Sequence, residues 1–536
     1  MVRKDFYLYL ILFFIFIMTY IFLLGSYELI DVDETRYVEI AKKMFLSKDY
    51  LTLKLNGAYF FEKPPLFFWL ECLSFKLFGK ISEFTARLPI VILSLLPSCL
   101  LFCISKKVKD IKFAFINLII LMSSLEYVIL TKMAILDSVF TSFTVASVLC
   151  FFYTFYTDGK KKKIFNILIY MFSALAVLAK GIPGVIIPYS IIIVTSFIFK
   201  SYNKLFLNLL LGTLIFLIIV IPWHYIMLDI HGMDFFNDYI VKHHIMRFIG
   251  SDIIGKQQPI YFYFLTILWG FFPYTFTFIF GIVSDLKKIY FDKIKFLDIN
   301  RNFDKFIFLN IISAVLILIF FSASTTKLIT YILPVFPFLS VITGRYFYTF
   351  IYENENKNFV YYSLITLALF MFIASLLSCF VYFYVEKDIY INIINLQIFI
   401  VLTFFISSFL IFSLLINNKR LYSLIYIAFF MSLISCIGGY LVHKFDYSFG
   451  QNDLMKYAKL AKENNYTIST YLTGKRYSLL YYSDLDNIDF HSKDEIWFNN
   501  EIKKKNNLII IRNRDLNLVN IKPKYKGVKY SIIQNN

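Results

Sequence analysis

The feature that most constrains this chain is a series of long apolar runs that recurs along most of its length. A helix needs about 20 apolar residues to cross a bilayer, and about thirteen segments approach that length. They lie near residues 7–25, 86–104, 113–130, 138–156, 164–180, 182–199, 204–222, 260–281, 305–321, 328–350, 359–384, 392–416 and 421–442. With 59% hydrophobic and only 17% charged residues, a soluble globular protein is excluded. We expect a polytopic α-helical membrane protein with about thirteen transmembrane helices.

The charges between the apolar runs predict the orientation of the helices. The formal net charge is +18, but the lysines form short clusters in loops rather than a basic aromatic face that would bind nucleic acid. If Arg3 and Lys4 are cytoplasmic, the other cytoplasmic loops include "SKKVKDIK", "TDGKKKK", "SDLKKIYFDKIKF" and "NNKR". These loops are lysine-rich, as cytoplasmic loops usually are. The opposite, periplasmic face then receives loops 26–85 and 223–259 and the tail.

The tail differs in character from the rest of the chain. "DLMKYAKLAKENN" has helical spacing, whereas "YTISTYL", "NNLIIIRN" and "VKYSIIQ" have the composition of short strands. No glycine-rich nucleotide-binding motif accompanies these strands. We therefore expect a transmembrane domain over residues 1–444, which includes both long loops. A small periplasmic α/β domain over residues 445–536 would have a structural or substrate-gating role.

Short polar motifs lie at the predicted external ends of the apolar runs. They are "DVDETRY", "FEKPP", "KMAILDS", "AKGIPG", "HHIMRF" and "TTKLITYILP". A charge at membrane depth costs roughly 3 kcal/mol unless it faces a cavity or a partner. For each motif alone, an interfacial anchor or a solvated loop charge is a simpler explanation than a functional site. Because all of them fall on one face, we expect them to converge on one cavity.

The first long loop begins with a helix whose acidic residues have two explanations. In "DETRYVEIAKKMF" the apolar residues have helical spacing, and the acidic residues lie at the N-terminal end, where the helix dipole favours negative charge. Helix capping is the simpler explanation, and a catalytic carboxylate is the other. We expect Lys42 and Lys43 to lie on an exposed helix and Asp31 to tolerate replacement by Asn. Glu62 and Lys63 directly precede a rigid Pro-Pro element at the membrane surface.

Taken in order, these motifs resemble a known family. "DETRY", "YFFEKPPLFFWL", "RLP", "LDS", "LAKGIPG", "HHIMRF" and "KLITYILP" are similar to motifs of the bacterial aminoarabinose transferase (ArnT) family. That family belongs to the GT-C-like membrane glycosyltransferases related to protein O-mannosyltransferases. Its members take a sugar from undecaprenyl phosphate at the periplasmic face of the inner membrane and usually transfer it to lipid A. The resemblance covers essentially the whole chain.

The resemblance also implies roles for individual residues. Asp33 and Asp137 would be the catalytic carboxylates, and the substrate would be bound by Arg36, Tyr37, Lys63, Lys180, Arg247, Lys327 and Tyr331. Among these, Lys63, Arg247 and Tyr331 would hold the carrier phosphate, since a leaving phosphate needs cationic and hydroxyl donors. A divalent metal such as zinc would be held by Glu62 and His244, for which a plain Glu–His hydrogen bond is the alternative. No nucleotide cofactor is expected, because the donor is a lipid.

We therefore expect a glycosyltransferase of the inner membrane that modifies lipid A with an amino sugar, such as aminoarabinose or galactosamine. A protein hydroxyl or another glycan remains an alternative acceptor. A lipid or sugar transporter is a more remote alternative. Transport would predict charges along the helices at mid-membrane and an inverted repeat, and we find neither in the sequence.

Overall fold

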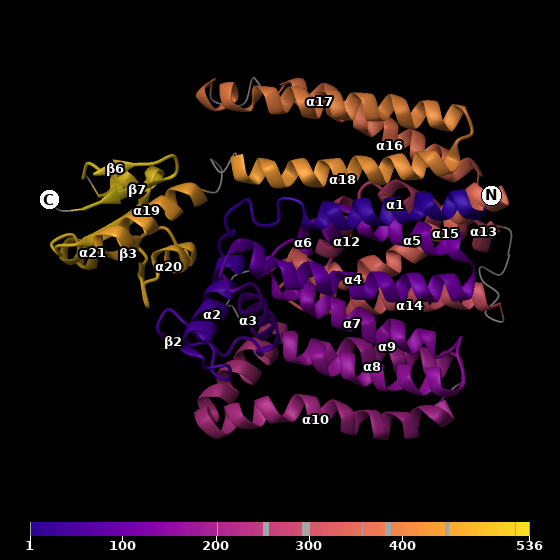
Figure 1. Cartoon of the computed structure of the whole chain (residues 1–536), viewed down its shortest axis with the longest axis horizontal. Coiled ribbons are helices and arrows are strands. Elements are labelled where there is room, and N and C mark those ends of the chain that lie inside the picture. The colour runs from indigo at the N-terminus through magenta and orange to yellow at the C-terminus, as the bar shows by residue number, and fades with distance from the viewer. Residues whose placement is uncertain are drawn as a thin grey trace.

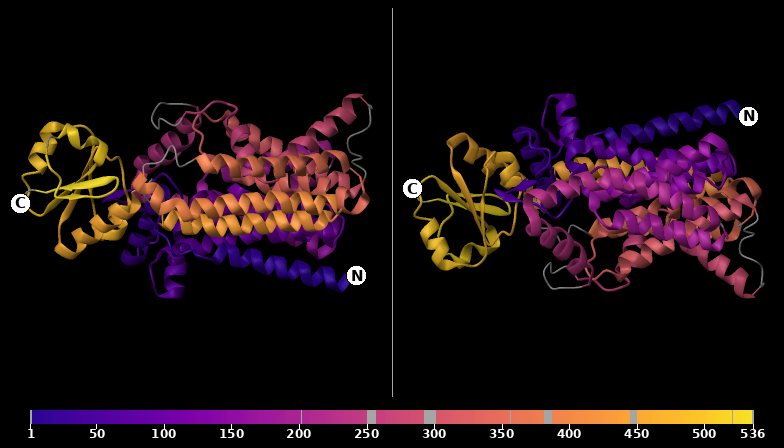
Figure 2. Two further views of the ribbon diagram at one scale, coloured as in Figure 1. Left: turned by 90° about the horizontal axis from the view of Figure 1, so that it is seen from above. Right: turned by 90° about the horizontal axis from the view of Figure 1, so that it is seen from below.

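The computed structural model describes residues 2–200, 202–249, 257–291, 301–355, 357–380, 387–444, 450–519 and 521–534. Long helices lie side by side in a bundle, and a small sheet stands beyond one end of it (Figure 1). The N-terminus lies at the opposite end, and both further views agree on this separation (Figure 2). We call the end of the bundle next to this sheet the sheet end. We call the opposite end, where the lysine-rich connections between helices lie, the lysine end.

The bundle consists of α1 (Val2–Ile21), α4 (Glu83–Val108), α5 (Ile111–Ser123), α7 (Leu136–Tyr153), α8 (Gly159–Lys180), α9 (Pro183–Ile198), α10 (Tyr202–Phe235), α12 (Phe262–Gly270), α13 (Thr275–Phe291), α14 (Asn302–Ala323), α15 (Phe336–Tyr348), α16 (Lys357–Ser378), α17 (Lys387–Ile416) and α18 (Arg420–Lys444). Among the described residues, 9 helical spans are long and apolar enough to cross a membrane, or 10 if α12 and α13 form one bent span. The prediction of a polytopic helical membrane protein is confirmed, and the count of about thirteen spans stays a prediction.

Two of the expected spans are interrupted, and the interruptions meet each other. The predicted span 113–130 breaks at Ser124 into α5 and α6 (Leu125–Leu130), and the predicted span 260–281 bends by 119° between α12 and α13. Pro273 lies in the second break, where it lacks the N–H that a continuous helix would use. The backbone N–H of Leu125 donates to the carbonyl of Phe272 at 3.0 Å. One break thus satisfies a polar group of the other, as a membrane interior requires.

The lysine-rich connections gather at the lysine end. Lys109, after α4, pairs with Glu353 at 2.8 Å, and Arg420, at the start of α18, donates to the carbonyl of Phe350 at 2.6 Å. The hydroxyl of Tyr156, after α7, donates to the carbonyl of Asn302, at the start of α14, at 3.2 Å. These contacts join connections that the charge pattern placed on one face. The assignment of that face to the cytoplasm stays a prediction.

The sheet end carries the first long loop and the C-terminal sheet. The loop contains α2 (Asp33–Ser47), the short hairpin of β1 (Lys54–Leu55) and β2 (Ala58–Tyr59), and α3 (Leu66–Phe78). The C-terminal unit contains α19 (Gln451–Asn464), β3 (Thr467–Tyr471), α20 (Ser478–Ser483), β4 (Asp489–His491), α21 (Glu495–Glu501), β5 (Asn507–Arg512), β6 (Tyr525–Lys526) and β7 (Tyr530–Ile533). Its strand order is β4-β3-β5-β7-β6. Strand β3 runs parallel to β4 and β5, and β7 runs antiparallel to its neighbours.

Candidate functional site

A cavity of about 340 Å³ lies at the sheet end of the bundle. Its polar lining consists of Lys63, Lys180, His243, His244, Arg247, Ser324 and Tyr331. Its apolar wall comes mainly from Ile182, Pro183, Ile186, Phe248, Phe320 and Phe321. Cationic groups are thus grouped in an apolar surrounding, an arrangement that suits a ligand with an anionic head and a hydrocarbon chain.

Lys180 is held in place by Asp137. Lys180 is the last residue of α8, and its amino group pairs with the carboxylate of Asp137 in the first turn of α7. The other carboxylate oxygen of Asp137 accepts a hydrogen bond of 2.6 Å from Thr330, in the 3-10 helix η3 (Ile329–Val335). Both oxygens of Asp137 are therefore occupied. In this arrangement Asp137 orients Lys180 over the ring of Tyr331, 3.9 Å from its centroid.

Arg247 and Tyr331 form the second polar group of the cavity. Arg247 begins α11 (Arg247–Ile249), directly after the π-helix η1 (Phe236–Met246), and its Nη2 donates to the Tyr331 hydroxyl at 2.6 Å. Its buried Nε has no hydrogen-bond partner in the part of the chain that the structure describes. Because Tyr331 accepts from Arg247, its own hydroxyl proton remains available to a ligand. This pair can donate to an anion from two directions.

Lys63 completes the cationic group from the first loop. Its side chain lines the cavity and is buried, with 8% of its surface exposed. Burial, and then repulsion by Arg247, lower the pKa of Lys63 to about 7, although Glu62 opposes the shift. An anion bound here would restore the charge of Lys63. The site therefore favours an anionic ligand.

The N-terminal part of α2 contributes a second, mixed-charge group beside the cavity. Arg36 donates from Nη2 to Asp33 at 2.7 Å and to the Tyr37 hydroxyl at 3.0 Å, and its Nη1 lies 3.6 Å from Glu62. Burial alone would raise the pKa of Glu62, but Arg36, and after it His243, lower it below its usual range. Burial raises the pKa of Tyr37; Arg36 opposes this shift, while Asp33, Asp137 and Glu62 add to it. Tyr37 is thus joined to this mixed-charge group through Arg36.

Helix capping does not explain Asp33. Val32 occupies the N-cap position of α2, and no side chain caps it with a hydrogen bond. The carboxylate of Asp33 pairs with Arg36, and its side chain is 45% exposed. Asp33 is thus held by Arg36, while part of its carboxylate remains exposed.

The structure does not bring every predicted residue to the cavity. Lys327 donates to the carbonyls of Gln258, at 3.0 Å, and Ser324, at 2.5 Å. It is absent from the residues that line the cavity. Its contacts tie together two backbone segments rather than meeting a ligand, so a role in substrate binding stays a prediction.

The predicted metal ligands do not form a fitting donor set. Nδ1 of His244 lies 2.6 Å from the carbonyl oxygen of Tyr239, and its Nε2 faces Gly181, where an added Cβ would lie 2.1 Å away. Gly181 also has a φ of +91°, which favours glycine. Over the described ranges, no group of three or more His, Cys, Asp or Glu side chains could hold a metal ion. Zinc sites usually supply three or four protein ligands, so Glu62 and His244 alone do not fit such a site.

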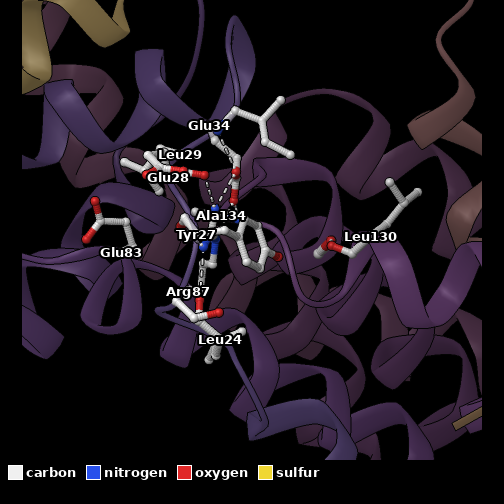
Figure 3. A network of polar contacts seen from close by, with 12 residues as sticks. Leu24, Tyr27, Glu28, Leu29, Glu34, Glu83, Arg87, Leu130 and Ala134 are labelled. Carbon is white, nitrogen blue, oxygen red and sulfur yellow. Dashed lines mark hydrogen bonds and ion pairs between the residues drawn. The ribbon is translucent and has the colours of Figure 1, made fainter. Parts of the chain in front are cut away.

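A buried ion pair that the sequence reasoning left without a role fixes the first loop. Arg87, on α4, and Glu34, on α2, are both fully buried and bond through two contacts of 2.9 Å (Figure 3). Arg87 also donates to backbone carbonyls of the loop, and Glu34 accepts from the N–H groups of Ile30 and Ala134. The "RLP" motif was the only sign of this pair in the sequence. The pair fixes the first turn of α2, which also carries Asp33 and Arg36.

The expectation that Lys42 lies on an exposed helix was wrong. Lys42 is 6% exposed, because α2 packs against α20; its amino group donates to the carbonyl of Tyr481 at 2.5 Å and pairs with Asp484. Asp31 accepts hydrogen bonds from Ser478, of 3.0 Å from the backbone N–H and 2.5 Å from the hydroxyl. Both residues therefore make structural contacts near the site, and neither serves as an inert control position.

Parts of this chain match known proteins. The family described as dolichyl-phosphate-mannose-protein mannosyltransferase matches residues 6–236. An undecaprenyl phosphate-alpha-4-amino-4-deoxy-L-arabinose arabinosyl transferase from Proteus mirabilis is 30% identical over 339 residues. The match covers 63% of this chain and 59% of that relative, which is less than two thirds of the relative's length.

Solved structures share the fold. ArnT from Cupriavidus metallidurans, in a crystal structure bound to undecaprenyl phosphate, has a TM-score of 0.79 at 18% identity, with coverage of 99% of this chain and 98% of that one. The archaeal oligosaccharyltransferase AglB from Archaeoglobus fulgidus, in complex with an inhibitory peptide and a dolichol-phosphate, has a TM-score of 0.52 at 11% identity. That match covers 96% of this chain and 70% of the other. At these identities the likeness concerns the fold alone.

Proposed function

This chain belongs to the ArnT-like family of lipid-linked membrane glycosyltransferases, and we propose from this premise that it transfers a sugar from undecaprenyl phosphate to an acceptor. One observation carries the proposal. Lys63, Lys180 and Arg247, with the hydroxyl of Tyr331, meet in an apolar cavity at the sheet end. A polyprenyl phosphate has the same division into a charged head and a hydrocarbon chain.

The proposed reaction makes one bond and breaks one. An acceptor oxygen attacks the anomeric carbon of the sugar, and the bond between that carbon and the phosphate oxygen breaks. Undecaprenyl phosphate leaves with the electron pair. Charge develops on the leaving phosphate, where Lys63, Arg247 and Tyr331 are placed to donate, and such donors in a low-dielectric site lower the barrier.

Asp137 and Asp33 take different roles in this scheme. Asp137 is occupied by Lys180 and Thr330, which suits an orienting role better than proton transfer. Asp33 keeps one side open beside Arg36. With an acceptor that is already an anionic phosphate, Asp33 orients the acceptor or attracts a cationic amino sugar. With a hydroxyl acceptor, Asp33 takes the proton as general base.

We place the reaction at the periplasmic face of the bacterial inner membrane. The lysine end would face the cytoplasm. The chain would then cross the membrane about thirteen times, counting α1 and the interrupted helices as crossings. Residues 1–444 would form the transmembrane domain and residues 445–536 a periplasmic α/β domain. The support is the gathering of lysine-rich connections opposite the cavity.

Lipid A is the proposed acceptor and an amino sugar the proposed substituent. The carboxylates of Asp33 and Glu62 beside the cavity favour a cationic sugar over a neutral one. A protein hydroxyl or another glycan is the alternative acceptor. The proposed metal role of Glu62 and His244 is not needed for any step.

Mass spectrometry of lipid A tests the proposal. Lipid A from cells that carry the gene should contain a substituent that is missing from a deletion strain, and its mass names the sugar. Complementation with Arg247→Ala should fail to restore it, whereas Arg514→Ala should restore it, because Arg514 is 72% exposed on the C-terminal unit. Unchanged lipid A in the deletion strain would refute this acceptor.

A further inference from the structure

The C-terminal unit is bonded directly to the start of the helix that carries Asp33. Ser478, at the start of α20, donates two hydrogen bonds to Asp31, one residue before the N-cap of α2. Asp31 also accepts from the hydroxyl of Thr35 in the first turn of α2. One carboxylate therefore joins α20 to the first turn of α2.

A second set of contacts continues along α2. Lys42 reaches both the carbonyl of Tyr481 and the carboxylate of Asp484, and Lys43 pairs with Asp486 at 2.7 Å. Asp484 also pairs with Lys462 of α19. The C-terminal unit thus contacts α2 near both of its ends.

The residue before Ser478 lies next to the mixed-charge group. Tyr477 is buried, with 6% of its surface exposed, and packs against Phe490 at 5.7 Å between ring centroids. Arg36 and Glu62 both interact with its hydroxyl electrostatically. The C-terminal unit therefore contributes a side chain, at the N-cap of α20, that interacts electrostatically with two of the site residues.

We propose that the C-terminal unit is a positioning element of the reaction centre. In this unit, α20 holds α2 so that Asp33 and Arg36 face the sugar. The inference rests on the proposed function. The Glu34–Arg87 pair ties the first turn of α2 to α4, and the Asp31–Ser478 bonds tie the residues just before that turn to α20. The donor phosphate is held by residues of other elements, so loss of the α20 contacts should affect transfer rather than donor binding.

The test compares two serine substitutions in the full-length protein. Ser478→Ala removes the hydroxyl that bonds Asp31, whereas Ser469→Ala removes an equally buried hydroxyl that bonds Glu501 inside the C-terminal unit. A displacement of about 1 Å can cost about a hundredfold in rate, and in Ser478→Ala the backbone N–H can still bond Asp31. We therefore expect Ser478→Ala to lower kcat about tenfold and to leave KM for the lipid donor unchanged. Ser469→Ala should keep both, and Ser478→Thr, which retains the hydroxyl, should recover kcat.

Hydrogen exchange of peptides from residues 33–47 supplies a readout that needs no activity. Exchange should rise in Ser478→Ala and not in Ser469→Ala. If the wild-type protein transfers no sugar, the proposed function fails, and the exchange result still decides whether α20 orders α2. Equal kcat and equal exchange in the two variants would overturn the inference. Raised exchange in Ser478→Ala with an unchanged kcat would also overturn it.

Discussion

The guanidinium of Arg247 donates a 2.6 Å hydrogen bond to the hydroxyl of Tyr331, a residue 84 positions further along the chain. Three bundle helices, α12, α13 and α14, lie between the two residues in the sequence. The fold thus assembles its anion donors from distant segments: Lys63 from the first loop, Lys180 from α8, Arg247 from α11 and Tyr331 from η3. Displacement of any one of these segments would separate one anion donor from the others.

The binding of the carrier lipid should depend on the protonation of Lys63. Its pKa of about 7 lies below the ordinary 10.5, so above pH 7 the free protein must take up a proton before Lys63 can pair with phosphate. Phosphate monoesters carry nearly full charge above pH 7, because their second pKa is about 6. We expect the Kd of undecaprenyl phosphate to rise about tenfold per pH unit between pH 7 and 9.

Lys63→Arg is the matched control for this pH dependence. Arginine stays charged throughout this range, so the variant should bind with an affinity that hardly changes with pH. Binding measured by tryptophan fluorescence in detergent micelles from pH 6 to 9 gives both curves. A wild-type curve as flat as that of Lys63→Arg would contradict the prediction.

The Glu34–Arg87 pair should matter mainly for stability. Arg87→Ala leaves a fully buried carboxylate without its cation, and breaking such a pair costs about 3 to 5 kcal/mol. The variant should lose most of its thermal stability in detergent, whereas Arg87→Ala combined with Glu34→Leu should regain part of it, since no buried charge remains. An unchanged melting temperature in Arg87→Ala would show that the pair does not hold the loop.

The sequence predicted the membrane class and the members of the cavity better than it predicted their contacts. Charge alternation placed Lys63, Lys180 and Arg247 on one face, and the structure brings them together. The sequence did not predict that the carboxylate of Asp137 pairs with Lys180 and accepts a hydrogen bond from Thr330, because those contacts depend on the packing of α7, α8 and η3. Lys42 looked exposed because its cover, α20, lies more than 400 positions away, as the separation of 439 between Lys42 and Tyr481 shows.

The stability of the protein should fall as the pH rises from about 4.5 to 7 through Glu39. Burial raises the pKa of Glu39 from 4.5 to about 7; Lys42 and Lys43 oppose the shift, and Asp484 and Asp486 add to it. Between these pH values the folded protein holds a proton that the unfolded chain has lost, so stability decreases with rising pH. Glu39→Gln should remove this slope and add roughly 3 kcal/mol at pH 8. Melting curves from pH 5 to 8 that run parallel for the two proteins would contradict this sign.

Asp33→Asn should keep the fold and remove most transfer activity. Asparagine can still accept a hydrogen bond from Arg36, but it has no charge with which to orient an amino sugar or take a proton. Asp158→Asn is the matched control, because Asp158 is exposed at the lysine end and caps no helix through its side chain. Asp31→Asn is unsuitable as a control, since it weakens the bond to Ser478. Near-normal transfer by Asp33→Asn would make its carboxylate dispensable.

The release of undecaprenyl phosphate from a synthetic undecaprenyl-phosphate amino sugar, followed by mass spectrometry in vesicles that contain the purified protein and lipid A, tests the central claim most directly. We expect the wild-type protein to release undecaprenyl phosphate and to form one glycosylated lipid A for each molecule released. Arg247→Ala should do neither, although it remains inserted in the vesicles. Movement of the intact donor across the membrane without cleavage of the sugar–phosphate bond would contradict the account and indicate a transporter.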